Sequence, residues 1–437
     1  MSAAGKIFGI GLAALSFVSA AGCEDAPAPA PSASTTATAT ATTGDRSSWT
    51  PSHTARTTSY QMAVRNHDKQ TADTERRLKL KPGDLGIMSK LVGQLQTSSS
   101  RLGRLEALDR IVALGEEAVQ KHPGDAEAYL LRARTRGAVH RFPEALADLD
   151  KAEELGTDPE QTVLSRATIQ LGLGNYDEAL KLANAALEQR QTSTTLTIVA
   201  AVLGRMGKLD EAEKRFTEAD RSYVGVNPFQ LAWIYFEWGS MYDRAGKPDE
   251  AKARYRAAVE RLPGYAHAAG HLAAMTSRSE AKALLEPITR TSDDPEYVAN
   301  LAAIMNAEDP GSGKVKMSEA TARYASLMKK HPLAFADHAG WFYLDAVGKI
   351  DEAVEVAEMN LEARKVPEAY ELLVASLVAA KERDEACRRA DEGLAHPYPT
   401  PALKAFAAKA YDACGKQDLA AELRASLKGA EAGRGKH

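Results

Sequence analysis

Few residues in the chain have the types and the spacing that catalysis or metal binding requires. His267 and His271 are four residues apart in a predicted helix, a spacing that can direct two imidazoles at one metal ion. No third ligand stands near them in the sequence, so we interpret the pair as part of a helix surface. Residues 311–314 read GSGK, which is shorter than a phosphate-binding loop and follows a predicted helix instead of a strand. These patterns predict neither a metal centre nor a nucleotide site.

The acidic pairs and the cysteines have structural interpretations as well. Asp249 and Glu250 stand at a predicted helix start, where the helix dipole favours negative charge, so acid–base catalysis is not needed to explain them. Cys387 and Cys414 are predicted at the facing ends of neighbouring antiparallel helices, and we hypothesise a disulfide between them in an oxidising compartment. No Ser or Cys stands in a recognisable nucleophile motif. The sequence therefore predicts a protein that is not an enzyme and needs no cofactor.

The overall composition argues against two other classes of protein. The 437 residues carry a formal net charge of -4 with both signs mixed, so no basic surface for nucleic acid is expected. No apolar run reaches the roughly 20 residues that a membrane-spanning helix needs. Aromatic residues make up only 6% of the chain and alanine is abundant, which favours close packing of helix on helix.

The N-terminal 22 residues are nearly uncharged and end in small side chains. Lys6 is followed by an apolar run that stops at Gly22, which predicts a secretory signal peptide over residues 1–22. The ending SAAGC resembles the lipobox of bacterial lipoproteins, although Ala20 stands where that family usually has Leu. The resemblance implies that Cys23 is acylated and anchors the protein in the bacterial cell envelope, at the outer membrane facing the periplasm. Ordinary cleavage after the small residues, which would release a soluble secreted protein, is the alternative.

The next segment has the composition of a tether. Residues 24–58 are almost entirely Ala, Pro, Ser and Thr, and such a segment cannot bury enough apolar surface to offset its ordering entropy. We therefore interpret residues 23–58 as a lipid-attachment cysteine followed by a disordered tether. Fully extended, the tether would span at most about 115 Å.

From residue 59 onward the chain is rich in helix formers and carries a repeated turn. The phrase GNYDEA begins at Gly174, GKLDEA at Gly207 and GKIDEA at Gly348, and weaker copies begin at His140, Lys381 and Gly415. The spacing from Gly174 to Gly207 is 33 residues, and the spacing from Lys381 to Gly415 is 34. A fixed period in this range indicates an array of two-helix repeats.

One copy shows the pattern most completely, in the stretch from Tyr235 to Pro263. Bulky and small residues alternate there at helical spacing, and the set is Tyr235, Trp238, Gly239, Tyr242, Ala251, Tyr255 and Pro263. This set resembles the tetratricopeptide repeat, and the resemblance extends over residues 84–427. It implies an all-α, right-handed solenoid of about ten antiparallel helix pairs, preceded by the signal peptide and the disordered linker.

The resemblance also divides the chain into parts. Residues 59–125 are predicted to form N-terminal helices and a degenerate capping repeat, 126–400 the regular array, 401–428 a C-terminal capping repeat, and 429–437 a disordered tail. Four units depart from the pattern: 193–231 has an extra linker, 266–294 is short, 295–333 carries an insertion, and 334–366 has Asp337 and Trp341 in unusual places. A repeat cannot bury both its faces alone, so the units must stack and the ends need caps.

In the family, the first helix of each repeat lines the concave side of the array. The residues expected on that side, and therefore predicted to bind a partner, are Arg134, Arg205, Trp233, Phe236, Asp243, Arg244 and His267. Thr168, Phe335, His338, Phe342 and Asp345 are expected on equivalent faces. Aromatic side chains and arginines are typical of binding hot spots. The alternative is that Trp233 and Phe236 pack against the extra linker near Pro228 and Phe229.

The predicted function follows from the array and from the N-terminal anchor. We expect a membrane-tethered scaffold that binds a protein or peptide partner on its concave face. An assembly factor or pilotin-like protein for an envelope or outer-membrane complex is the alternative. An enzyme or metal-binding protein is a third class, and the histidine pair is its only support in the sequence.

Overall fold

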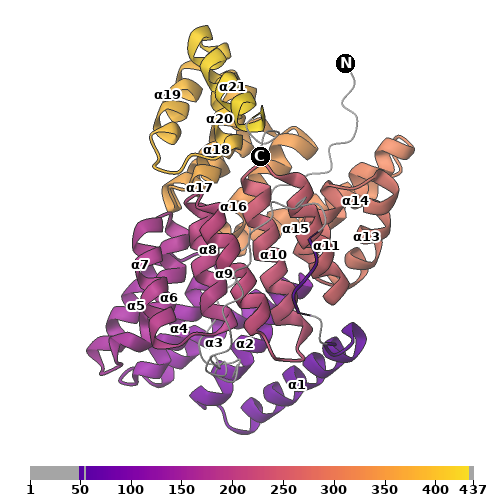
Figure 1. The fold of residues 1–437 in the computed structure, drawn as a ribbon. Coiled ribbons are helices and arrows are strands. Elements are labelled where there is room, and N and C mark those ends of the chain that lie inside the picture. Colours follow the sequence, from indigo (N-terminus) through magenta and orange to yellow (C-terminus); the bar gives the residue numbers. More distant parts are fainter. Residues whose placement is uncertain (1–48, 54–55, 433–437) are drawn as a thin grey trace, which may run out of the picture.

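The computed structural model describes residues 49–53 and 56–432, and every regular element in these ranges is a helix (Figure 1). The first ten α-helices are α1 (Tyr60–Leu80), α2 (Leu85–Leu102), α3 (Ala107–Lys121), α4 (Ala126–Ala138), α5 (Phe142–Glu154), α6 (Pro159–Leu173), α7 (Tyr176–Gln189), α8 (Ser193–Arg205), α9 (Leu209–Ser222) and α10 (Pro228–Arg244). The others are α11 (Pro248–Arg261), α12 (Ala266–Ala274), α13 (Arg278–Thr291), α14 (Pro295–Glu308), α15 (Lys314–Lys330), α16 (Pro332–Trp341), the π-helix η2 (Phe342–Val347), α17 (Ile350–Ala363), α18 (Pro367–Ala380), α19 (Arg383–Leu394), α20 (Pro401–Ala413) and α21 (Gln417–Ala432).

Consecutive helices pack as hairpins, and successive hairpins pack on one another. After α1, the pairs run from α2 with α3 to α20 with α21, and the stretch from Tyr235 to Pro263 forms most of α10 and all of α11. The predicted all-α array of stacked helix pairs is therefore confirmed.

The repeated turn phrase reverses the chain between the two helices of a pair. Gly246 ends α10 with a φ of 66°, and the same left-handed backbone recurs at Gly174, Gly207, Gly348 and Gly415. In the weaker copies Lys381 and His140 adopt it without glycine, with φ values of 66° and 57°. The acidic residues that follow lie in the first turn of the next helix, as at Asp249 and Glu250 of α11.

The small residues of the pattern allow the two helices of a pair to approach closely. A Cβ atom on Gly239 of α10 would lie 2.7 Å from the ring of Tyr255 on α11. The Tyr255 side chain is fully buried, so it has little freedom to move away. This contact explains why a glycine stands between Trp238 and Tyr242 in the best copy of the repeat.

The irregular units keep the stacking by local adjustment. The short unit has a nine-residue α12, and the insertion of the next unit forms the turn between α14 and α15. In α16, shortly before it continues into η2, Asp337 is buried against Arg364, the residue after α17, with 2.5 Å between Asp337 Oδ2 and Arg364 Nη2. Trp341 packs against Phe406 of α20, with ring centroids 5.6 Å apart. This unit thus adds a buried ion pair and a wider helical turn, while Gly340 keeps a close approach to Val356 of α17.

The array curls until its first helices contact later repeats (Figure 1). Phe335 of α16 belongs to the apolar cluster of α2 and α3, which includes Leu91 and Leu108. Between α2 and α3, the carbonyl of Gly103 accepts a hydrogen bond from Ser292 Oγ at 2.7 Å and one from Asp293 N at 3.1 Å. The N-terminal helices therefore join the middle of the array instead of forming a free end.

Later repeats also contact α6, α7 and α8. Tyr398, in the loop before α20, donates a hydrogen bond to Asp177 of α7 at 2.9 Å. A Cβ atom on Gly174 would lie 3.1 Å from the backbone oxygen of Lys365, which shows how closely these loops approach. The sequence predicted an inner wall left free along its whole length. The structure differs because side chains and loops from distant repeats cross that wall.

Some predicted segments have other limits or lie outside the described residues. Residues 49–53, expected in the tether, pack on the body of the protein, and α21 extends to Ala432, beyond the expected cap. Cys387 and Cys414 form a disulfide with their Cα atoms 6.5 Å apart, which agrees with the predicted pairing. The signal peptide, Cys23 and residues 433–437 lie outside the description. Among the described helices, none has the length and hydropathy to cross a membrane.

Candidate functional site

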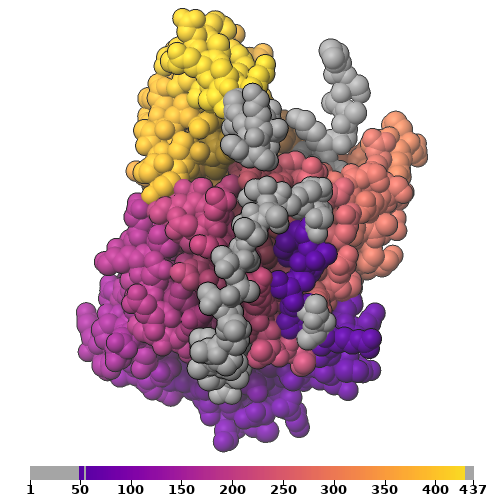
Figure 2. Space-filling view, in the orientation of Figure 1, coloured from indigo at the N-terminus to yellow at the C-terminus, as the bar shows by residue number. Residues whose placement is uncertain are grey.

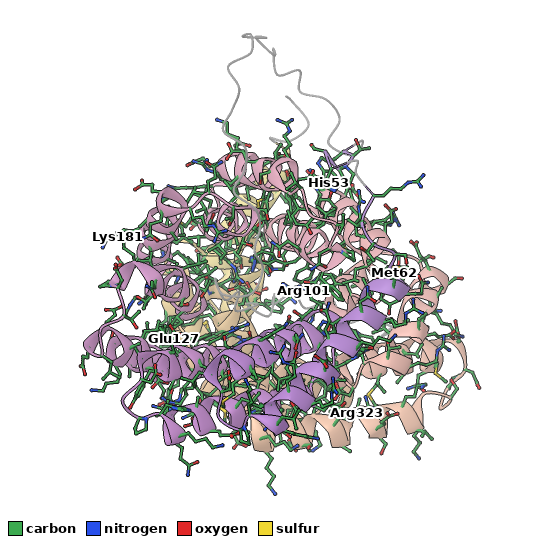
Figure 3. The ribbon with its side chains drawn as sticks, turned by 90° about the horizontal axis from the view of Figure 1, so that it is seen from below. His53, Met62, Arg101, Glu127, Lys181 and Arg323 are labelled. Atoms are coloured by element: carbon green, nitrogen blue, oxygen red, sulfur yellow. A yellow bond between two sulfur atoms is a disulfide. The ribbon has the colours of Figure 1, made fainter. Side chains whose placement is uncertain are left out.

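The inner side of the curved array is the candidate binding surface, and it is more enclosed than the sequence indicated. Figure 3 shows Arg101 near the middle of the ring of helices, whereas Glu127, Lys181 and Arg323 lie on its outer rim. We call the inward sides of α2, α4, α8, α10, α12, α14, α16 and α18 the inner face.

The aromatic residues predicted to contact a partner are buried in this structure. Trp233 is 3% exposed and Phe236 is 1% exposed. Phe236 contacts the rings of Tyr255 and Tyr265, with centroids 5.7 and 5.2 Å away, and Trp233 Nε1 donates to Glu237 Oε1 at 3.0 Å. Direct binding by Trp233 and Phe236 is therefore wrong for this conformation, because neighbouring helices already cover both rings. The alternative of packing against the extra linker is also incomplete, since these partners lie on α10, α11 and the loop before α12.

Arg205 and Arg244 converge on one carboxylate from a distant repeat. Glu368, at the start of α18, has its Oε1 2.7 Å from Arg205 Nη1 and 3.3 Å from Arg244 Nη1. The Glu368 side chain is only 4% exposed, and its second oxygen, Oε2, has no hydrogen-bond partner. Both predicted arginines thus lie on the inner face, but in a buried ion-pair cluster that joins α8, α10 and α18.

The charges in this cluster favour an ionised Glu368 beside a protonated, neutral Glu371. Burial opposes ionisation of Glu368, but the charges of Arg205 and Arg244 outweigh burial and lower its pKa. Burial and the charge of Glu368 raise the pKa of Glu371 to about 8, and Glu371 also accepts a hydrogen bond from Thr400. Two arginines and one carboxylate leave the cluster with a positive balance near neutral pH.

Arg101 is the part of the inner face that the sequence analysis missed. Its guanidinium lies 5.4 Å from the ring centroid of Trp233 and 5.6 Å from that of Tyr265, a cation–π arrangement that joins α2 to α10 and to the loop before α12. Arg101 stands in the polar run QTSSSRLGR, within the residues predicted to form a degenerate capping repeat. The polar run within a predicted helix was the one available signal, because Arg101 reaches its aromatic partners only when the array closes.

The predicted histidine and aspartate residues form separate polar contacts. His267 Nδ1 lies 2.9 Å from Tyr297 Oη, and burial lowers the pKa of His267 to about 3, so the ring is neutral. His271 Nδ1 lies 3.1 Å from Asp243 Oδ2, which also accepts from Tyr255 Oη at 3.2 Å. The two histidines therefore have different partners, and no group of metal-ligating side chains is found in the part of the chain that the structure describes.

Arg134 of α4 contacts α2. Its Nε donates to Gln96 Oε1 at 2.6 Å, and Nη1 donates to the backbone oxygen of Ser89 at 3.4 Å. Both acceptors are on α2, the helix that also carries Arg101. Arg134 thus holds the N-terminal hairpin against the array.

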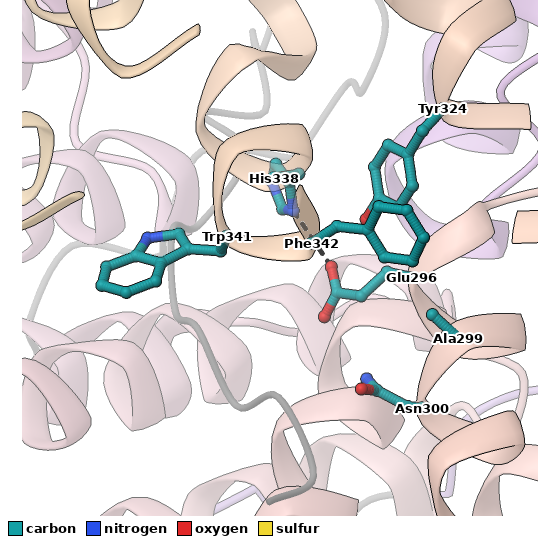
Figure 4. A pocket seen from close by; sticks show the side chains of 7 residues that line it. All are labelled: Glu296, Ala299, Asn300, Tyr324, His338, Trp341 and Phe342. Carbon is teal, nitrogen blue, oxygen red and sulfur yellow. Dashed lines mark hydrogen bonds and ion pairs between the residues drawn. The ribbon is translucent and has the colours of Figure 1, made fainter. Parts of the chain in front are cut away.

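A small pocket opens between α14 and α16 (Figure 4). Its lining residues are Glu296, Ala299, Asn300, Tyr324, His338, Trp341 and Phe342. His338 Nδ1 lies 3.0 Å from Glu296 Oε2. Burial would lower the pKa of His338, but the charge of Asp337 and the hydrogen bond to Glu296 outweigh it and raise this pKa to about 10. The pocket therefore contains a protonated imidazole paired with a carboxylate.

The chemistry of the inner face suits recognition. The described groups are arginines, carboxylates, aromatic rings and one imidazolium, arranged in ion pairs and cation–π contacts. Such groups hold polar chains through hydrogen bonds and charge complementarity. The pocket is too small for a cofactor, with room for little more than a water molecule.

Comparison with known proteins gives little beyond the helical architecture. No protein family and no curated protein sequence matches the chain. Among solved structures, 169 chains match, and one is from the structure of Naa15/Naa10 bound to HypK-THB. That chain is 14% identical, and the alignment covers 83% of the present chain and 67% of the other, with a TM-score of 0.25. A similarity of this size carries no argument about shape or partners, so the functional inference depends on the geometry above.

Proposed function

We propose that this protein is a non-enzymatic helical-repeat scaffold that binds an extended protein segment along its inner face and is attached to a membrane by a lipid on Cys23. The observation that carries the binding proposal is the charge on the inner face. Arg101, Arg205, Arg244, Glu237 and Glu368 converge there from α2, α8, α10 and α18.

Buried charges are costly, and their cost is an argument for a role in recognition. Replacing a buried ion pair with apolar residues of similar volume is often neutral or stabilising, so folding alone does not require this cluster. The unpaired Oε2 atom of Glu368 supports the proposal further. Because Oε2 is buried, a backbone N–H or a hydroxyl of a bound segment would give this oxygen the donor that it lacks only where the array opens around Glu368. Extended segments present such donors at regular intervals along the backbone.

Membrane attachment is supported by sequence alone. The pattern SAAGC ending at Cys23 is the ground for it, and this cysteine lies outside the described residues. Replacing Cys23 with Ser should abolish incorporation of a labelled fatty acid and move the protein from the membrane fraction to the soluble fraction. Unchanged lipid incorporation in Cys23→Ser would contradict the assignment.

The binding proposal is tested by comparing an inner and an outer position. Arg101→Gln alters the inner face, and Lys181→Gln, on the outer rim, is the matched control with a side chain that is 75% exposed. Affinity capture from envelope extract, quantified by mass spectrometry, should recover a specific protein with wild type and with Lys181→Gln. We expect at least about a tenfold loss with Arg101→Gln, as for a hot-spot arginine. Equal recovery by both variants would contradict binding on the inner face, provided that circular dichroism shows both to be folded.

A further inference from the structure

A short extended segment before α1 fills a slot on the other side of α10. We call residues 49–53 the strap and the site that it occupies, formed by α9, α10 and α11, the slot. In Figure 2 the strap lies, in indigo, on the surface of the protein beside the helices of these central repeats. Its contacts come from residues more than 160 positions away in sequence, so the slot is a tertiary feature.

Trp49 is the apolar anchor of the strap. Its ring meets those of Trp238 and Tyr235 edge-on, with centroids 5.1 and 5.8 Å away. The guanidinium of Arg254 lies 4.2 Å from the Trp49 ring centroid and 4.9 Å from that of Trp238, so it contacts both indoles. Phe216 of α9 stacks on Trp238 at 5.6 Å. The slot therefore offers an aromatic and cationic site that favours an indole, the ring with the strongest cation–π attraction.

The slot also binds the backbone of the strap. Asp220 Oδ2 accepts hydrogen bonds from the backbone N–H groups of Ser52 and His53, at 2.6 and 3.3 Å. Arg261 Nη2 donates to the backbone oxygen of His53 at 2.7 Å. Asp220 is fully buried, and its other oxygen accepts from Tyr235 Oη at 2.8 Å, which fixes the carboxylate in place. Proteins recognise extended peptides in this way: they bind one side chain in a pocket and form hydrogen bonds with both N–H and C=O groups of the backbone.

The extra linker between α9 and α10 now has a structural explanation. It adds Tyr223, whose ring lies 5.6 Å from that of His53, and Val226, whose backbone oxygen accepts from Thr58 N at 2.8 Å. A regular repeat lacks these residues. The extra linker thus contacts His53, at the end of the strap, and Thr58, just before α1.

We propose that the slot is a recognition site for an extended, tryptophan-bearing segment and that the strap occupies it in cis. The docking does not depend on the proposed function. One consequence of the docking does depend on the proposed function. If Cys23 carries a lipid, the chain from the membrane anchor reaches the central repeats first and not the first helix. Only the 25 residues from 24 to 48 then separate lipid and body, a span of at most about 90 Å.

The test uses the purified full chain and trypsin cleavage after Arg56, an exposed residue between the strap and α1. A docked strap restrains this bond, and a protease needs the segment to open locally. Trp49→Ala should speed cleavage after Arg56 by about ten- to a hundredfold, since cleavage follows the population of the open form. Unchanged cleavage would overturn the proposal.

A pair of variants at Ser52 tests whether Asp220 binds the backbone of the strap or whether any substitution in the strap makes it open more easily. Ser52→Pro removes the N–H that Asp220 accepts from, whereas Ser52→Ala keeps it and alters only an exposed side chain. We expect faster cleavage with Ser52→Pro and the wild-type rate with Ser52→Ala. Equal rates for the two variants would overturn the assignment of Asp220 as the backbone acceptor.

Light scattering tests whether the strap binds its own chain or a second copy. A mass that is the same for wild type and Trp49→Ala at every concentration is the result expected for binding in cis. A wild-type dimer that dissociates on Trp49→Ala would overturn the cis assignment. The cleavage and light-scattering measurements involve neither a membrane nor a partner protein. A result that refutes the docking of the strap is therefore distinct from a result that refutes the proposed function.

Discussion

The two ends of the array are held in different ways. At the N-terminal end, α2 and α3 are joined to distant repeats by Phe335 and by the contacts of Gly103 with Ser292 and Asp293. At the C-terminal end, α21 packs against its partner α20, and the disulfide between Cys387 and Cys414 joins α19 to the end of α20. The first hairpin is held by packing on distant repeats, whereas the last helices combine such packing, at Tyr398, with a covalent bond.

The difference shows how a stacked array protects its terminal repeats. A repeat at the end of a solenoid has a neighbour on only one side and so loses about half of its stabilising interface. The N-terminal hairpin gains a second neighbour because the array curls. The last helix, α21, packs against α20, and the disulfide limits how far these last repeats can unfold.

The largest expected effect comes from breaking the apolar contact at the N-terminal end. Phe335→Ala should reduce the free energy of unfolding by about 3–5 kcal/mol, because it leaves a cavity in the cluster of α2 and α3. Urea denaturation followed by circular dichroism measures the change. Val315→Ala is the control, since Val315 is 80% exposed on neighbouring α15. Equal stability of the two variants would show that Phe335 does not hold the N-terminal hairpin against the array.

The next effect concerns the ion pairs of α16, the helix that carries Phe335. His338→Asn should cost about 2–4 kcal/mol at pH 7, because it leaves Glu296 and Asp337 without the buried cation between them. The pKa of His338 is raised to about 10 in the folded protein, above its ordinary value of 6.5. Its contribution is therefore complete below pH 6.5 and is lost as the pH rises through 10. Denaturation at pH 7 and pH 10.5 should show a smaller cost at the higher pH, and an equal cost would contradict the charged imidazole.

Removing the disulfide should weaken one end only. Replacing both Cys387 and Cys414 with Ala should lower the free energy of local opening of α19–α21 by about 2–4 kcal/mol, because the unfolded segment is no longer closed into a loop. Hydrogen exchange should speed up in these helices and remain unchanged in α2 and α3. Faster exchange at both ends would mean that the ends are coupled, contrary to the comparison above.

The smallest expected effect is on the loop between α2 and α3. Asp293 accepts from the backbone N–H groups of Leu105 and Glu106 at 2.5 and 2.8 Å, and Asp293→Asn weakens both bonds by removing the negative charge. We expect a loss of about 1 kcal/mol, measured by the same denaturation. Asp309→Asn, in the loop before α15, is a control without these contacts. No difference between the two variants would remove this loop from the contacts that hold the N-terminal end.

The repeats could be predicted from the sequence because their signals are local. The turn at Gly246, the acidic residues after it and the small Gly239 all act within one hairpin, and the structure confirms the hairpin. The disulfide could be predicted for the same reason, since its cysteines lie in adjacent repeats.

The candidate site depended on contacts between distant repeats, which no local pattern contains. Arg205 was expected to face a partner, yet it meets Glu368 from a helix 163 residues further along the chain. Trp233 and Phe236 were expected on an open surface, but Arg101 of distant α2 lies over Trp233, and Tyr255 and Tyr265 of adjacent elements cover Phe236. Trp49 stood in a segment whose composition predicts disorder, and only the slot formed by α9–α11 gives it a place to dock. Propensity and periodicity do not encode such docking.

Site-specific photo-crosslinking tests the central claim, binding on the inner face, most directly. A photoreactive amino acid is placed at position 101 in one variant and at position 181 in another, and both are irradiated in intact cells. The account predicts a covalent adduct with another polypeptide at position 101 and none at position 181. Adducts at position 181 alone, or the same adducts at both positions, would contradict it.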